Sequence, residues 1–269
     1  MNTTTPGVGS QGGPLAGLAD VLRSEFSKLC SVRSTYWTLV AALALNVGFA
    51  ALEAIFLPSR LSAGDAAGLD AVRVSLGGSH LSQVAFGVLG VLVITGEYSS
   101  GMIRVTFCAV PRRRLVLAAK ATVFTATGLV VGIAVSFAAY FVFEGLLAGD
   151  RLRSSIGDPG VARAVVGGGL YLAALGLLGL GIGAIIRSTA GAVATLFTLL
   201  FIPQILAELL PHAWKVSIGR YLPMQAGSQI FSQHSEAGAL SPWTGFGVFS
   251  LYAVFALVAG FILINKRDV

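Results

Sequence analysis

Residues 164–186 read AVVGGGLYLAALGLLGLGIGAII, an uninterrupted run without a charged side chain. The hydrocarbon core of a bilayer is about 30 Å thick and is crossed by about 20 helical residues. The run therefore predicts a transmembrane helix. Its Gly179 and Gly183, like Gly128 and Gly132 in another apolar run, have the four-residue spacing that allows membrane helices to pack closely.

Five further runs are long and apolar enough to cross a bilayer: 36–57, 79–96, 115–143, 189–210 and 243–264. Hydrophobic residues make up 55% of the 269 residues and charged residues only 11%, and the mean hydropathy is +0.82. The short alternating segments of a membrane barrel are absent from the sequence. We therefore predict an all-α integral membrane protein with six transmembrane helices.

The distribution of charge predicts how these helices are oriented. If both termini lie on the same side, that side carries eleven of the 18 Lys and Arg residues and four of the 12 Asp and Glu residues. By the positive-inside rule this side is cytoplasmic, and we expect a multi-pass protein of the cell membrane. The net charge of +6 does not predict nucleic-acid binding, because the basic residues are scattered over loops that flank the membrane.

Three parts of the chain are expected. Residues 1–16, rich in Gly, Thr, Ser and Pro, predict a disordered cytoplasmic tail. Residues 17–34 predict an amphipathic helix at the membrane interface, because apolar residues recur there at helical spacing: Leu18, Val21, Leu22, Phe26 and Leu29. Residues 35–269 form the transmembrane domain, in which we expect short helices at the outer headgroups within the loop 211–242, as an exit lid or a passive cap.

The connection between the second and third predicted spans is the main functional candidate. Residues 97–120 read EYSSGMIRVTFCAVPRRRLVLAAK and contain five of the 18 basic residues. The positive-inside rule places this segment in the cytoplasm. A short, basic, cytoplasmic connection is a candidate docking surface.

The segment resembles the corresponding connection of ABC exporter permeases of the type-2 family. The family pattern runs from a Glu through Gly-Thr-x-Arg and Pro-x-x-Arg to Ala-Lys. The matching positions here are Glu97, Gly101, Arg104, Pro111, Arg114 and Lys120. Met102 stands where the family usually has Thr, and Phe107 where it usually has Leu.

The resemblance implies a transmembrane permease subunit that exports an apolar or amphipathic substrate, such as a drug, a lipid or a peptide. It implies that these six residues couple the permease to cytosolic ABC ATPase subunits, which hold the ATP and Mg²⁺, and that a second permease, identical or related, completes a dimer. The chain itself is then neither an enzyme nor a cofactor-binding protein. Gly96 and Gly101 have the spacing that begins a P-loop, but Met102 and Ile103 replace its Lys and Ser or Thr.

Polar residues within the predicted spans are candidates for a substrate pathway, because such residues often mark function in a membrane. The deepest are Asn46, Gln83 and Gln204. The alternative for each is a hydrogen bond between two helices.

Two alternative functions would require other features in the sequence. An ion-coupled secondary transporter would need buried ionisable residues and usually inverted repeats. An intramembrane enzyme would need convergent catalytic groups, whereas His80, His212 and His234 fall at or outside the outer boundary without an HExxH spacing. We expect no catalytic residues, no metal site and no disulfide, since Cys30 and Cys108 both map to the cytoplasmic side.

Overall fold

The computed structural model describes residues 17–60, 69–147, 152–209, 211, 217–233 and 238–266. The predicted tail 1–16, His212 and His234 lie outside this part. Within it the secondary structure is entirely helical: α1 (Leu18–Ser31), α2 (Arg33–Arg60), α3 (Ala71–Ser75), α4 (Ser79–Ser99), α5 (Met102–Ala109), α6 (Arg113–Leu146), α7 (Val161–Ile186), α8 (Thr189–Glu208), α10 (Pro223–Ser228), the 3₁₀ helix η2 (Gln229–Phe231) and α11 (Pro242–Lys266).

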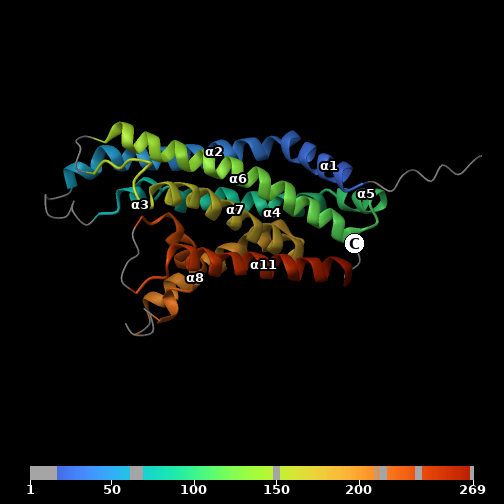
Figure 1. Cartoon of the computed structure of the whole chain (residues 1–269). Helices are drawn as coiled ribbons and strands as arrows, with labels where there is room; N and C mark the ends of the chain where they lie inside the picture. The colour runs from blue at the N-terminus through green and yellow to red at the C-terminus, as the bar shows by residue number, and fades with distance from the viewer. Residues whose placement is uncertain are drawn as a thin grey trace, which may run out of the picture.

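Six helices are long and apolar enough to cross a membrane: α2, α4, α6, α7, α8 and α11. The predicted six-span, all-α fold is confirmed. Figure 1 shows the long helices running side by side, with α1, α5 and the C-terminus at the same end of the bundle. The α1 helix and the end of α11 therefore lie on one side, as the charge distribution predicts.

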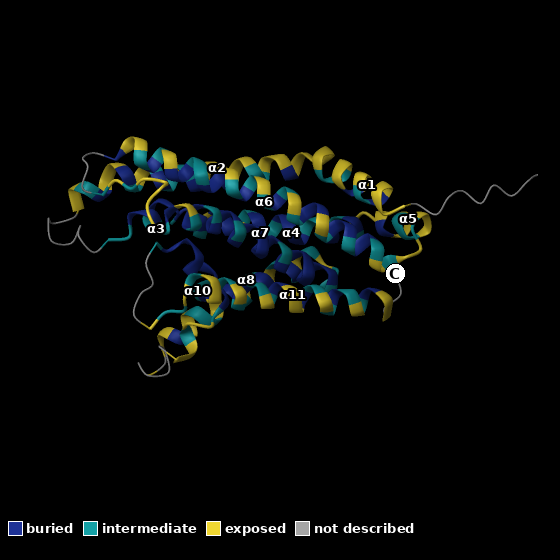
Figure 2. Cartoon of the chain, viewed as in Figure 1, coloured by how far each residue is buried: buried dark blue, intermediate teal, exposed yellow. Residues whose placement is uncertain are grey.

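The centre of the bundle is α7. It packs against α4, α6, α8 and α11. Of the 18-residue apolar stretch within α7, 78% is buried inside the bundle, compared with 22% of the corresponding stretches in α2 and α8. Figure 2 shows the same contrast, with α7 mainly dark blue and much of α2 and α11 yellow. The exposed apolar faces of the outer helices suit contact with lipid or with another membrane helix.

Glycines allow α7 to approach its neighbours. A Cβ at Gly90 of α4 would lie only 1.9 Å from the carbonyl oxygen of Gly176. A Cβ at Gly132 of α6 would lie 2.9 Å from the carbonyl oxygen of Gly169. These helices meet backbone to backbone, so the sequence-based interpretation of the glycine pairs as packing sites is confirmed for Gly132 and extends to Gly90.

The described part of the predicted outer loop 211–242 contains two short helices, but they do not lie on the surface. Ile230 and Phe231 in η2 are fully buried, and η2 packs against α7 and α11. The Arg163 guanidinium donates hydrogen bonds to the carbonyl oxygens of Ser232 and Gln233, both at 3.0 Å. The expectation of short helices is confirmed, and their apolar side chains pack into the bundle rather than lying free on its surface.

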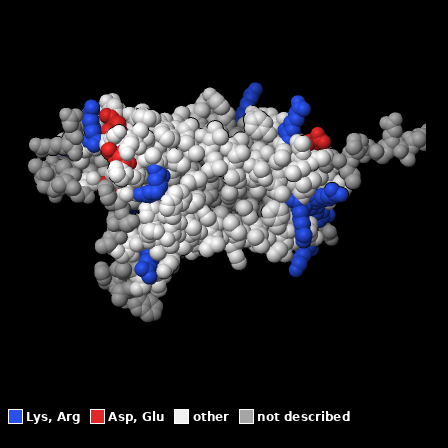
Figure 3. Space-filling model, in the orientation of Figure 1, with Lys and Arg blue, Asp and Glu red and all other residues white. Residues whose placement is uncertain are grey.

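The charged residues are distributed as the orientation requires. In Figure 3, Lys and Arg predominate at the end that carries α1, α5 and the C-terminus, whereas acidic and basic residues are mixed at the opposite end. The positive-inside rule predicts that the basic end faces the cytoplasm.

Two native thiols provide a test of this orientation. Cys30 in α1 and Cys108 in α5 are both free and exposed at the basic end. A membrane-impermeant maleimide is expected to label both in inside-out vesicles and neither in intact cells. Cys30→Ser and Cys108→Ser variants assign each label, and labelling of either thiol in intact cells would reverse the proposed orientation.

Candidate functional site

The residues that resemble the permease coupling pattern separate into two structural groups. Gly101, Arg104, Pro111 and Arg114 are exposed at the basic end. Glu97 and Lys120, in contrast, are buried, with exposed fractions of 8% and 3%. The first group can contact a partner directly, whereas the second lies inside the chain.

The exposed group is organised around α5. Gly101 precedes this helix with φ = +72°, a left-handed conformation that glycine adopts without steric cost, and so lets the chain reverse after α4. At the far end of α5, the Arg113 guanidinium lies 5.4 Å from the centre of the Phe107 ring. These contacts hold α5 as a defined helix between two membrane spans.

The outer surface of α5 combines apolar and basic side chains. Val105 is 70% exposed and Met102 is 50% exposed, and Arg104, adjacent to Val105 in the sequence, is also exposed. We call Met102, Arg104 and Val105 the α5 face. Exposed apolar residues next to a positive charge are typical of surfaces that bind other proteins.

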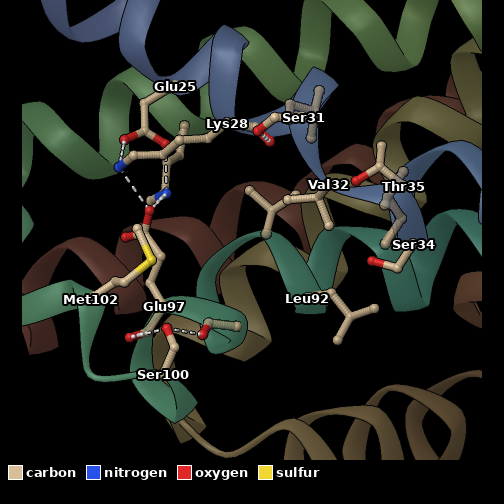
Figure 4. Close-up of a pocket in the computed structure, with 15 residues that line it drawn as sticks. Glu25, Lys28, Ser31, Val32, Ser34, Thr35, Leu92, Glu97, Ser100 and Met102 are labelled. Carbon is tan, nitrogen blue, oxygen red and sulfur yellow. Dashed lines mark hydrogen bonds and ion pairs between the residues drawn. The ribbon is translucent and has the colours of Figure 1, made fainter.

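The buried group forms an ion cluster with α1. Lys120 Nζ lies 2.5 Å from Glu25 Oε2 and 2.7 Å from Glu97 Oε1. Lys28 Nζ lies 2.7 Å from Glu25 Oε1 and 2.8 Å from Glu97 Oε1. We call Glu25, Lys28, Glu97 and Lys120 the ion cluster; Figure 4 shows Glu25 and Lys28 from α1 facing Glu97 from α4. It joins α1 to α4 and α6.

The ion cluster is electrically balanced, with two carboxylates and two ammonium groups. Burial lowers the pKa of Lys28, but its hydrogen bonds with Glu25 and Glu97 outweigh this effect and hold the pKa above the ordinary value of 10.5. A raised pKa in the folded state stabilises the protein below pH 10.5, and this contribution is lost as the pH rises through the folded-state pKa. The charges of Lys28 therefore stay in place at neutral pH.

The ion cluster also reaches α5, because Lys28 Nζ donates a weak hydrogen bond to Thr106 Oγ1 at 3.4 Å. The interfacial helix α1, the end of α4, the start of α6 and the α5 helix are thus connected through five side chains, the four of the ion cluster and Thr106. The α5 helix is thus linked to α1 by this hydrogen bond and to α4 by the chain reversal at Gly101.

Sequence reasoning missed Glu25 and Lys28 as members of a site. The signal for Glu25 is its position, since it falls within the apolar stripe of α1, four residues after Val21 and four before Leu29. Val21 and Glu25 are the buried residues of α1, while Leu18 and Phe26 remain 54% and 50% exposed. The helix therefore turns a carboxylate, and only part of its apolar stripe, toward the bundle.

Two of the three candidate pathway residues make hydrogen bonds between helices. Asn46 is buried and its Nδ2 donates to Ser79 Oγ at 3.2 Å. Gln83 Oε1 accepts a hydrogen bond from the Tyr171 hydroxyl. Gln204 is partly buried on α8, beside Pro203. Asn46 and Gln83 thus hydrogen-bond between helices, which is the alternative that the sequence left open.

Among the described residues, no group of three His, Cys, Asp or Glu side chains is placed to hold a metal ion. Comparison of the chain with models of known protein families gives no match, and no curated protein matches it. The six-helix fold, the α5 face and the ion cluster are therefore the features of the chain that bear on its function.

Proposed function

We propose that this chain is the transmembrane permease subunit of an ATP-binding cassette exporter that moves an apolar or amphipathic substrate. The α5 face is the observation that carries the proposal. It is a defined helix between two membrane spans, it lies at the basic end, and it exposes Met102 and Val105 beside Arg104. A cytosolic ATPase subunit with an apolar groove and acidic residues would complement this surface.

The proposal assigns different roles to the two groups of motif residues. Arg104, Pro111 and Arg114 would contact the ATPase. Glu97 and Lys120 would transmit movement to α1 from inside the chain, as positioning residues rather than contact residues. Closure of two ATPase subunits would then shift α5, the ends of α4 and α6, and α1 together, and so open the bundle toward the outside by rigid-body movement.

A second permease is part of the proposal. The mainly exposed α2, α8 and α11 carry large apolar side chains that would meet lipid or the second chain, such as Ile55, Ile205 and Phe255, with exposed fractions of 57%, 59% and 77%. Whether that chain is identical or related is decided by mass spectrometry of the purified complex.

The α5 face gives a direct test by copurification of an ATPase with the tagged chain. The double variant Arg104→Glu, Val105→Asp should reduce the amount of copurified ATPase by about tenfold or more, because it reverses the charge and removes the apolar contact. Arg60→Glu is the control and should leave copurification unchanged. Arg60 is exposed and is the last residue of α2, which ends at the opposite end of the bundle from α5. Membrane insertion is checked for each variant.

Two results would overturn the proposal. One is substrate transport by the purified chain alone on a proton gradient, which would favour the ion-coupled secondary transporter. The other is equal ATPase recovery with the parent, the double variant and Arg60→Glu, which would show that the α5 face does not bind the ATPase.

A further inference from the structure

A cavity of about 430 Å³ lies beside the ion cluster, under the junction of α1 and α2. Its volume is within the range of about 300–1,000 Å³ that is usual for small-molecule sites. The ion cluster lines one end, while Leu89, Leu92 and Val93 of α4 line the apolar part. Figure 4 shows Glu25, Lys28 and Glu97 gathered on one side of the cavity, with Val32, Thr35 and Leu92 on the other.

The polar end of the cavity has unused hydrogen-bonding capacity. Glu97 Oε1 accepts from both lysines, but Glu97 Oε2 has no partner in the described part of the chain, although the side chain is only 10% exposed. A buried acceptor without a donor costs about 1–3 kcal/mol. Thr35, 9% exposed, also lines the cavity, and its hydroxyl can both donate and accept.

The charge balance indicates which head group is favoured. Because the ion cluster carries two positive and two negative charges, a charged head group would leave a net charge in a largely buried place, which is costly. A neutral hydroxyl group can donate to a carboxylate and accept from an ammonium or hydroxyl group at no such cost. The apolar wall formed by Leu89, Leu92 and Val93 suits an alkyl chain.

We infer that this cavity binds an uncharged amphiphile, with a hydroxyl-bearing head group at the ion cluster and an alkyl chain along α4. Because α4 spans the membrane and the ion cluster is at the basic end, the ligand enters from the inner leaflet. Its role as the entry site for an exported molecule rests on the proposed function. The binding itself does not, since the residues that line the cavity belong to this chain.

A substitution at Gly96 can place a larger side chain in the cavity without disturbing the fold. It lines the cavity, and nothing lies within 4 Å of the position that a Cβ would occupy there. Gly96→Leu therefore places a side chain in open space, and leucine favours a helix more than glycine does. Gly247→Leu is the matched control, since Gly247 is also helical and also has nothing within 4 Å of its Cβ position, but lies on α11.

The test uses the chain alone in nanodiscs of zwitterionic lipid, without an ATPase. The probe is an alkyl glycerol ether with a photoreactive diazirine in its chain. We expect it to label α4, with labelling reduced about tenfold in Gly96→Leu, as loss of about 1.4 kcal/mol of binding would require, and unchanged in Gly247→Leu. Alkyl carboxylate and alkyltrimethylammonium probes of equal length should label α4 about tenfold less, since neither head group is neutral.

The outcomes separate the binding site from the proposed function. Equal labelling of Gly96→Leu and the parent, or equal labelling by all three probes, would overturn the inference and show partition into the bilayer only. Labelling that Gly96→Leu removes, without ATPase-dependent export of the glycerol ether, would establish a site for a resident lipid and overturn its role in entry. Failure of the parent chain to copurify any ATPase would leave the labelling result unaffected and would count against the proposed function alone.

Discussion

Replacing Lys120 with methionine is expected to release α1 from the bundle and to lower the free energy of unfolding by about 3–5 kcal/mol. The side chain is 2% exposed and its ammonium contacts Glu25 and Glu97 at 2.5 and 2.7 Å. Methionine keeps most of the volume but leaves two buried carboxylates with a single lysine. The energetic loss is therefore the cost of uncompensated buried charge rather than of a cavity.

Release of α1 and loss of stability are measured separately. Trypsin should cleave the variant after Arg23 and Lys28 in α1 much faster than it cleaves the parent, and thermal unfolding of the variant in nanodiscs should begin at a lower temperature. Lys266→Met changes an exposed lysine at the same end and is the control. Unchanged proteolysis and melting in Lys120→Met would show that the ion cluster does not hold α1.

A second substitution distinguishes charge from packing. Glu25→Gln combined with Lys120→Met removes one charge of each sign and leaves Lys28 with Glu97, which lie 2.8 Å apart. If the imbalance of buried charge lowers the free energy of unfolding in Lys120→Met, the double variant should be more stable than Lys120→Met alone. If the free energy of unfolding of the double variant falls by the sum of the two single decreases, the two side chains contribute independently.

The transmembrane helices could be predicted closely because their signal is local. The run 79–96 corresponds to α4 at Ser79–Ser99, and the run 164–186 to α7 at Val161–Ile186. Backbone groups in a membrane must be paired within the helix, so an apolar run of sufficient length has one structural solution. Both helices extend three residues past the apolar run, over Glu97 in α4 and over Arg163 in α7, so the run predicts their limits to within one helical turn.

The candidate site could be predicted only in part, because burial depends on neighbours that are distant in sequence. The basic connection was found from its charges, yet nothing in residues 97–120 shows that Glu97 and Lys120 face inward. Their burial depends on Glu25 and Lys28, which are supplied by α1. The depth of Ile230 and Phe231 was missed for a similar reason, since α7 and α11 provide the space that they fill.

Gly90→Ala is expected to separate α4 from α7, although it adds a single methyl group. The added Cβ would stand 1.9 Å from the Gly176 oxygen and 2.7 Å from its carbonyl carbon. Both are backbone atoms, so no rotamer change relieves the overlap and one helix must move. Overpacking of this kind costs about 1–3 kcal/mol or more, which corresponds to a fall in melting temperature of roughly 2–12 °C for a chain of this size.

Gly48→Ala is the matched control, because Gly48 also lies within a membrane helix and nothing lies within 4 Å of its Cβ position. This substitution should keep or slightly raise the melting temperature, since alanine favours a helix by about 1 kcal/mol over glycine. The two variants carry the same chemical change, so a difference between them reports helix contact rather than propensity. Equal melting temperatures would show that α4 and α7 are not in backbone contact at Gly90, and the central position of α7 would then need another cause.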